Sequence, residues 1–254
     1  NKEATFGPAN QPYDFIYVND LINAVYLLGI KETKNNFYFI GSGTPRLLKE
    51  YFGENNVYTN VYLKREGRQY AEKDFVVFYQ NKILSFEAKS NLLPKPELED
   101  SIDDIKRKCE ECIRKAYAQG LEVKRRVMDG TAIFYDNSKK KNNVVLDLSN
   151  TKVDECLQII VMYEEYLGIE TNIECIYPEF DAWIIDVKNL KFILSDTVGR
   201  GNFEEFVTYA QKRKNVYGLV SVPSGEELKV YNLYKHMPIF FEGDAKDKVI
   251  RIQI

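Results

Sequence analysis

The sequence predicts an α/β fold in which a mixed central β-sheet is flanked by helices. Three observations lead to this prediction. Two adjacent runs, 74–79 and 82–90, are rich in β-branched and aromatic residues and predict a pair of strands. Residues 101–126 then carry apolar side chains at helical spacing behind an acidic first turn, which predicts one long amphipathic helix. Further strand-like runs follow at 131–136, 144–148, 157–163 and 182–187.

The first two runs are predicted to form a β-hairpin. The polar dipeptide at 80–81 has the length of a two-residue hairpin loop. In that register Asp74 faces Glu87, and Glu72 faces Lys89. Because side chains alternate between the two faces of a strand, these four ionisable groups are predicted to share one surface.

Two opposed acids in such a hairpin call for an explanation. Directly opposed positions lie about 4.5–5.5 Å apart at Cβ, and two carboxylates at that separation repel each other unless a cation lies between them. The neighbouring positions are apolar on both faces, which is typical of a strand inside a sheet. Burying acids there is costly without a metal or a partner charge. The alternative is a surface hairpin with a solvated ladder of glutamate and lysine.

Asp74 and Glu87-Ala88-Lys89 form a pattern of an acid on one strand and Glu-X-Lys on the next. With these residues the chain resembles the PD-(D/E)XK nuclease superfamily over about 57–215, which implies a restriction-endonuclease-like core. By this resemblance Asp74 and Glu87 would hold Mg²⁺, or alternatively Mn²⁺, with the Ala88 carbonyl as a further ligand. Lys89 would orient or activate the attacking water. Hard oxygen ligands suit Mg²⁺, and the metal lowers the pKa of a bound water.

The resemblance also points to auxiliary residues. In the superfamily the helix after the Glu-X-Lys strand often supplies a glutamine to the site, and here the candidate is Gln119, with Tyr117 two positions earlier. Glu66 or Glu72 is the candidate for a further acid within reach of the metal. The proline of the superfamily's name is absent, because Lys73 precedes Asp74.

Much of the exposed surface of the predicted helix is basic. Such a stripe suits a phosphate backbone, and the partner expected is DNA. A solvated amphipathic helix is the alternative. Near the end of the resemblance, Arg213 and Lys214 are further candidates, although basic residues also favour a helix C-terminus for electrostatic reasons. The candidate contacts on the long helix are Lys106, Arg107, Arg114, Lys115, Lys124 and Arg125.

The first fifty residues have a different character. The runs 13–28 and 37–51 resemble the late part of an extended short-chain dehydrogenase of the nucleotide-sugar epimerase type. That family's glycine-rich phosphate loop and Tyr-X-X-X-Lys pair do not occur in this chain, which argues against hydride transfer. The predicted organisation is an epimerase-tail-like segment at 1–52 and a nuclease-like domain at 53–254. A truncated sugar-nucleotide-binding protein is therefore a third interpretation.

Composition narrows the function classes. The 254 residues are 44% hydrophobic, enough for a core, and the net charge of −3 means that DNA contacts must rely on local basic clusters. With one histidine, His236, acyl-transfer triads have few candidate members. A single C-x-x-C is weak evidence for a metal cluster, and unpaired thiols agree with a reducing compartment. The four cysteines are Cys109, Cys112, Cys156 and Cys175.

The function predicted from the sequence is metal-dependent hydrolysis of DNA, in defence or repair, by a protein with a cytoplasmic location. The absence of a long apolar run and of a signal-peptide pattern predicts no membrane partner. The alternative is a nuclease-like domain without catalysis that binds nucleic acid or acts as a scaffold. Cleavage mode, action on RNA and association with a second copy or another subunit stay open. The tail at 217–254 is predicted to form strands and turns.

Overall fold

The computed structural model describes residues 43–64, 70–89, 101–136, 143–162, 171, 173, 176–177, 180–216 and 226–242. The chain divides into two units, Asn1–Arg46 and Leu47–Ile254, and the described elements belong to the second unit except for the first residues of the helix Gly43–Phe52. Most of the epimerase-like segment expected at 10–51 lies outside the described residues.

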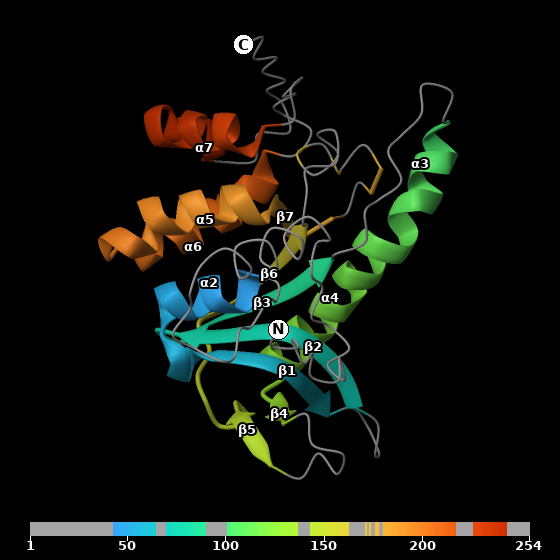
Figure 1. Cartoon of the computed structure of the whole chain (residues 1–254), viewed down its shortest axis with the longest axis vertical. Helices are drawn as coiled ribbons and strands as arrows, with labels where there is room; N and C mark the ends of the chain where they lie inside the picture. Colours follow the sequence, from blue (N-terminus) through green and yellow to red (C-terminus); the bar gives the residue numbers. More distant parts are fainter. Residues whose placement is uncertain are drawn as a thin grey trace, which may run out of the picture. The chain divides into compact units, whose positions relative to one another are not determined.

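A seven-stranded mixed β-sheet forms the centre of the second unit, in the order β5-β4-β1-β2-β3-β6-β7 (Figure 1). The pairs from β5 to β3 are antiparallel, whereas β6 runs parallel to β3 and β7 parallel to β6. This confirms the predicted α/β fold with a mixed sheet flanked by helices. The strands are β1 (Val57–Lys64), β2 (Tyr70–Tyr79), β3 (Lys82–Lys89), β4 (Ile133–Tyr135), β5 (Val144–Asp147), β6 (Glu155–Met162) and β7 (Trp183–Asp186).

The helix predicted after the hairpin is confirmed, and it contains a π-helical turn. A capping box between Ser101 and Asp104 starts it, because each side chain accepts a hydrogen bond from the other residue's backbone N–H. Its segments are α3 (Ile102–Cys109), the π-helical η2 (Glu110–Arg114) and α4 (Lys115–Met128). The remaining helices are α2 (Gly43–Phe52), α5 (Val187–Asp196), α6 (Phe203–Asn215) and α7 (Glu227–His236), with 3₁₀ turns η1 (Glu54–Asn56), η4 (Val198–Arg200) and η5 (Pro238–Phe241).

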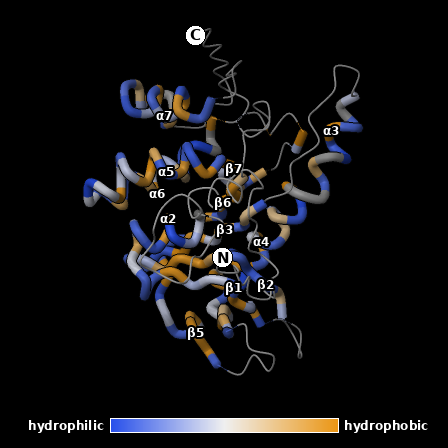
Figure 2. Tube along the Cα trace, viewed as in Figure 1, coloured by the Kyte–Doolittle hydropathy of each residue, from blue (hydrophilic) through white to orange (hydrophobic). Residues whose placement is uncertain are grey.

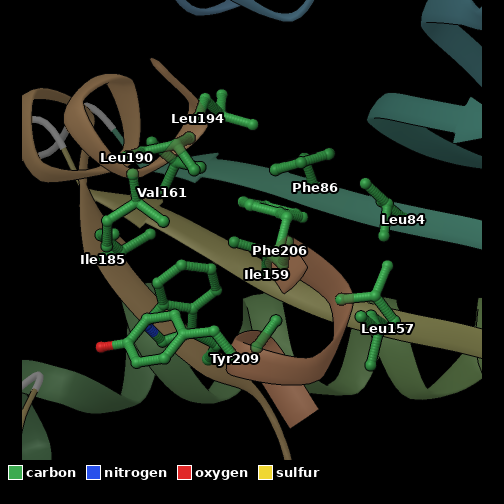
Figure 3. Packing of buried hydrophobic residues seen from close by; sticks show 14 of the residues in the cluster. Leu84, Phe86, Leu157, Ile159, Val161, Ile185, Leu190, Leu194, Phe206 and Tyr209 are labelled. Carbon is green, nitrogen blue, oxygen red and sulfur yellow. The ribbon is translucent and has the colours of Figure 1, made fainter. Parts of the chain in front are cut away.

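The helices cover the two faces of the sheet. On one face, β3 and β6 pack with α2, α5, α6 and α7 through a cluster that includes Phe86, Ile159 and Phe206, which we call the α6 core (Figure 3). On the other face, Val123 and Val127 of α4 pack on β1, β2 and β3 in a cluster that we call the α4 core. Hydrophobic and hydrophilic residues alternate along α5, α6 and α7, as expected for helices with one face on a core (Figure 2).

Helix α2 contributes to the core of the second unit. Leu47, Leu48 and Phe52 are buried in the α6 core, although the sequence assigned them to the amino-terminal segment. The phenyl ring of Phe52 makes edge contacts with Tyr79 and Phe203. The end of this segment is therefore packed with the sheet.

The predicted hairpin is confirmed in its turn and in most of its register. The pairs run from Tyr79 with Lys82 to Phe75 with Phe86. The two loop residues have φ angles of 48° and 60°, the left-handed values that a type I′ turn requires. This turn matches the twist of the strands and sets which residues of β2 and β3 meet.

Strand β2 changes face at Asp74. Phe75 packs in the α6 core, whereas the side chain of Lys73, two residues earlier, reaches α4 on the opposite face. In a regular strand residues two apart share a face. The alternation is therefore broken between Lys73 and Phe75.

Strand β1 changes face at the same level of the sheet. Val57 lies in the α6 core and Val61 in the α4 core, although regular alternation would put them on one face. Between them is Asn60, with φ of 50°, which lies opposite Asp74 in the register of the two strands. The register of the two strands is the same on both sides of Asn60, so one residue of each strand is skipped and both strands turn their side chains to the other face.

The carboxyl-terminal tail differs from the prediction. Its described part contains α7 and η5 rather than strands, because Val230 and Tyr231 give the segment an apolar side that packs on the α6 core. None of the helices in the described ranges is long and apolar enough to cross a membrane.

Candidate functional site

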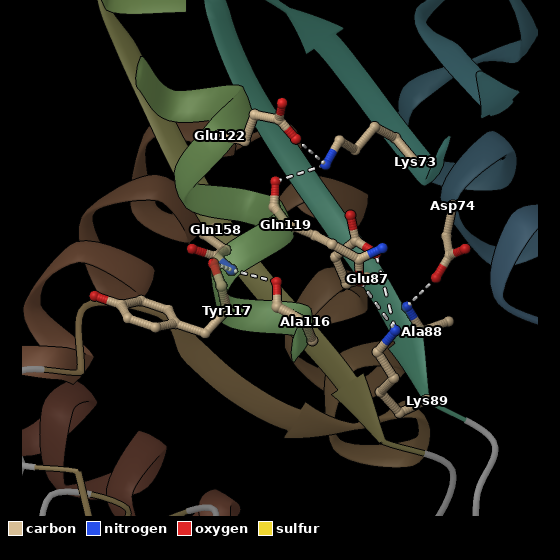
Figure 4. A network of polar contacts seen from close by, with 10 residues as sticks. All are labelled: Lys73, Asp74, Glu87, Ala88, Lys89, Ala116, Tyr117, Gln119, Glu122 and Gln158. Carbon is tan, nitrogen blue, oxygen red and sulfur yellow. Dashed lines mark hydrogen bonds and ion pairs between the residues drawn. The ribbon is translucent and has the colours of Figure 1, made fainter. Parts of the chain in front are cut away.

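The predicted acidic site lies where β2 and β3 separate (Figure 4). The pairing of the two strands ends at Phe75 and Phe86, so the predicted direct opposition of Asp74 to Glu87 is not part of the ladder. Instead, the Asp74 Oδ2 atom accepts a hydrogen bond of 2.8 Å from the backbone N–H of Ala88. The change of face in β2 is the reason, because it moves Asp74 out of the regular alternation.

Glu87 is a buried acid that lacks hydrogen bonds. Its side chain is 1% exposed, and neither carboxylate oxygen has a hydrogen-bond partner. The Lys89 Nζ atom lies 4.0 Å from Oε2, an ion pair that is too long for a hydrogen bond. Burial and then repulsion by Asp74 raise the pKa of Glu87 to about 8.

Asp74 is better compensated than Glu87. Burial raises its pKa, while the Lys89 ammonium and the hydrogen bond from Ala88 act in the opposite direction. The two acids are close enough for Asp74 to raise the pKa of Glu87. The site therefore holds two buried acids whose ionised forms are only partly compensated by hydrogen-bond donors and cations.

Lys89 and Gln119 meet at the site, as predicted for both. The Lys89 Nζ atom donates to the Gln119 Oε1 atom over 3.4 Å, which places the amide of α4 over the end of β3 (Figure 4). Tyr117 is not brought to the acids. Its ring stacks on Phe180 with centroids 4.4 Å apart, and its hydroxyl oxygen accepts from the backbone N–H of Asp181.

Glu72 does not share one surface with Lys89 as predicted. Lys73 reaches α4, so the preceding residue of β2 lies on the opposite face of the sheet. There Glu72 pairs in register with Tyr62 of β1, whose hydroxyl donates to it. Glu72 nevertheless lies close enough to raise the pKa of both Asp74 and Glu87 slightly.

Lys73 is a component of the site that the sequence did not predict. It was noted there only because it stands where the superfamily's name has proline. Its side chain is fully buried, and its Nζ atom donates to the Gln119 backbone oxygen over 2.7 Å and to Glu122 over 3.5 Å. Its charge also lowers the pKa of Glu87. The signal available in the sequence was a lysine between two acids in a strand predicted to be buried.

Helix α4 approaches the sheet closely enough to deliver Gln119 because of a glycine. The Gln158 Nε2 atom of β6 donates to the backbone oxygens of Ala116 and Tyr117 over 3.0 and 2.9 Å. A Cβ atom at Gly120 would lie 2.0 Å from the Gln158 side chain, so a larger residue there would displace this amide from its hydrogen bonds to α4. Sequence reasoning identified neither residue, because the contact joins segments that are far apart in the chain.

The predicted basic stripe is partly neutralised by acids of the same chain. Arg107 pairs with Asp104, Arg114 with Glu110 and Lys124 with Asp181, at 2.8, 3.1 and 2.7 Å. The other three, Lys106, Lys115 and Arg125, are exposed. The surface that remains for a phosphate backbone is smaller than the sequence indicated.

Arg213 is not available to nucleic acid. Its side chain is 1% exposed, and its Nε atom lies 3.0 Å from both carboxylate oxygens of Glu227. The same carboxylate accepts from the Trp183 Nε1 atom over 3.0 Å and from the Tyr209 hydroxyl over 2.6 Å. The expected nucleic-acid contact is thus wrong for Arg213, which belongs to a buried network instead.

The acids fit a divalent metal in their chemistry. A buried carboxylate without hydrogen bonds beside a second carboxylate has the charge and the free lone pairs that a cation satisfies. In the described part of the chain, three or more His, Cys, Asp or Glu side chains do not gather as a metal-binding group. Mg²⁺ commonly binds one or two protein carboxylates and keeps several waters, so two acids and a carbonyl suit it.

Comparisons of the chain with protein-family models, with curated proteins and with solved structures found no match. The interpretation of the site therefore rests on the residues described above. They form a buried pair of acids, Asp74 and Glu87, with two lysines and a glutamine around it.

Proposed function

We propose that this chain is a divalent-metal-dependent phosphodiesterase that hydrolyses DNA, built on a restriction-endonuclease-like core. The single observation that carries the proposal is Glu87, whose buried carboxylate has no hydrogen-bond partner and lies beside Asp74. An acid in that state costs folding free energy. A cation that binds both acids offsets this cost. Metal binding would therefore explain why the two acids are buried together.

The proposed metal ligands are the Asp74 and Glu87 carboxylates and the Ala88 carbonyl oxygen. The hydrogen bond from the Ala88 N–H already holds one oxygen of Asp74 toward β3, which leaves the other for a ligand. When bound, Mg²⁺ or Mn²⁺ would lower the pKa of a coordinated water and neutralise charge on the phosphate.

Lys89 is proposed to orient the attacking water and the phosphate. Its ammonium group lies 4.0 Å from Glu87 and 3.4 Å from Gln119, and its side chain is 19% exposed, so the side chain is held by the protein and still reaches solvent. The Gln119 amide restricts the position of this ammonium group. In the hydrolysis, the water oxygen bonds to phosphorus, the bond to the leaving oxygen breaks, and the leaving oxygen receives a proton.

Lys73 is proposed to hold the framework of the site. It binds the Gln119 backbone and Glu122, and so connects β2 to α4 next to Asp74. Because it is fully buried, it does not contact substrate. Its charge favours the ionised form of Glu87, which is the form that binds metal.

The test is cleavage of linear, circular and single-stranded DNA by the purified chain with Mg²⁺ or Mn²⁺. Asp74→Ala and Lys89→Ala should each remove the activity, whereas Asp129→Ala, a change of an exposed acid at the end of α4, should retain it. Metal-dependent cutting that survives both site substitutions would refute the proposed site.

A second candidate function is a nucleic-acid-binding or scaffolding domain without catalysis. The observation that favours it is the position of Glu72, the third acid, which accepts a hydrogen bond from Tyr62 on the other face. DNA binding without cutting, with either metal and on every substrate, would select this candidate over the phosphodiesterase.

A further inference from the structure

Three tyrosines gather on one face of the sheet beyond the point where β1 and β2 change face. Tyr62 of β1 pairs in register with Tyr135 of β4, and the rings of Tyr70 and Tyr135 meet edge to face with centroids 5.4 Å apart. All three are partly exposed. We call Tyr62, Tyr70 and Tyr135 the tyrosine patch.

The patch lies on the face opposite α4. Leu63 and Phe134 are buried in the α4 core, so Tyr62 and Tyr135, which are adjacent to them in their strands, point to the other side. The ring contact places Tyr70 on the same side. The change of face at Asn60 and Asp74 is what separates these rings from the α6 core, which ends at Phe75 on this side.

Along β2 the patch lies next to the proposed active site, on the face of the sheet opposite to Lys89 and Gln119. The Tyr62 hydroxyl donates to Glu72, and partial burial and this carboxylate raise the pKa of Tyr62. Glu72 is two residues before Asp74 in β2, the strand that carries one of the proposed ligands. The rings therefore begin close to Asp74 along the sheet.

Lys64 adds a positive charge to the patch. It pairs in register with Tyr70 and lies two residues from Tyr62, so it projects on the same face of the sheet. It is exposed and, within the described ranges, forms no ion pair with an acid. The face thus combines aromatic rings with a cation that is available to a phosphate.

We propose that the tyrosine patch binds unpaired bases, so that the substrate of the site is a single-stranded nucleic acid or the single-stranded part of one. Exposed aromatic rings beside a lysine are the means by which proteins bind single strands, because every base has a face that stacks. In a duplex the base faces are already stacked on one another, so they are not available to stack on the tyrosine rings. This inference rests on the proposed function, since it names the substrate class of that site.

The test measures binding separately from cleavage. The probe is a fluorescently labelled mixed-sequence oligodeoxynucleotide in metal-free buffer, with the same sequence as RNA and the matching DNA duplex as further arms. Fluorescence anisotropy compares wild type with Tyr70→Leu, Tyr135→Leu and Tyr135→Phe. The matched control is Phe192→Leu, a change of an exposed aromatic residue on α5. Thermal unfolding identifies any variant that fails to fold.

We expect the leucine variants to bind the single strand about tenfold more weakly than wild type. Tyr135→Phe, which keeps the ring, and Phe192→Leu should bind as wild type does. Duplex binding should change little in any variant. Weakening of the DNA and RNA single strands together supports stacking as the shared chemistry, and weakening of only one assigns the patch to that nucleic acid.

Two results overturn the inference. One is single-strand binding that is unaffected by the leucine variants, and the other is equal weakening on duplex and single strand. Metal-dependent cutting of duplex DNA with either result would leave the proposed function intact and remove the inference. Ring-dependent single-strand binding without cutting would retain the patch and remove the phosphodiesterase.

Discussion

Two glutamates of this chain are buried to the same degree and have opposite surroundings. Glu227 at the start of α7 accepts hydrogen bonds from Trp183 and Tyr209 and forms an ion pair with Arg213. Glu87 in β3 accepts none, and its nearest cation, on Lys89, is 4.0 Å away. Both side chains are at most 2% exposed. Burial alone therefore does not distinguish them.

The difference separates a structural acid from a functional one. Burial raises the pKa of both, but at Glu227 the Arg213 charge and three hydrogen-bonding side chains oppose that effect. The Glu227 network joins β7, α6 and α7 with its charges neutralised inside the protein. The Glu87 carboxylate keeps its lone pairs, which suits a ligand from outside. The hydrogen-bond and ion-pair partners of a buried acid, and not its burial, therefore indicate whether its role is structural or functional.

The largest expected effect is a loss of folding stability when Glu227, the buried acid with hydrogen-bond partners, is changed. Glu227→Gln should destabilise the fold by about 3–5 kcal/mol, because it leaves the buried Arg213 guanidinium without its counter-charge. Urea unfolding measures this, with the exposed neighbour change Glu226→Gln as the control, which should cost less than about 0.5 kcal/mol. A loss as small as that of the control would mean that the network does not stabilise the fold.

The next largest effect is the stabilisation of the fold by a metal bound at Glu87, the buried acid without hydrogen bonds. Mn²⁺ at a hundred times its dissociation constant should stabilise the wild-type fold by about 2.7 kcal/mol, as seen by thermal unfolding at pH 8. Glu87→Gln should remove the shift, whereas Glu226→Gln should keep it. An equal shift in Glu87→Gln would place the metal elsewhere.

A smaller effect of opposite sign to that at Glu227 is expected for Glu87→Gln without metal. The change removes a buried charge that has no hydrogen bond, so it should stabilise the fold at pH 8 by roughly 1–2 kcal/mol. Chelator-treated protein in urea gives the measurement. Destabilisation instead would show that Glu87 has stabilising partners, and the contrast between the two acids would fail.

Counted per pH unit, the smallest effect is the pH dependence of stability. Glu87 binds a proton below about pH 8 in the folded chain, but only below its ordinary value of 4.5 when unfolded. Between these values the folded state holds more protons, so the stability of the metal-free chain should fall as pH rises from about 5 to 8. The slope is at most about 1.4 kcal/mol per pH unit. Melting curves across this range should slope less in Glu87→Gln, and equal slopes would contradict the assignment.

Local patterns account for the parts of the fold that were predicted correctly. The two-residue loop and the alternation of 74–79 and 82–89 depend on neighbours in sequence, and so does the long helix that follows them. The change of face at Asp74 was missed because it depends on Asn60 in a strand outside the hairpin. That pairing moved Glu72 to the far face and Lys73 to α4.

By itself the sequence determined the α/β class, the hairpin with its two-residue loop and the helix behind it. These depend on turn chemistry and on periodicity, which act over a few residues. Only the tertiary structure decided which buried charges are neutralised. Trp183, Arg213 and Glu227 meet through packing of distant elements, and no such donor reaches Glu87. Whether an acid has partners is a property of the packed core, because desolvation and hydrogen bonding arise only after distant segments meet.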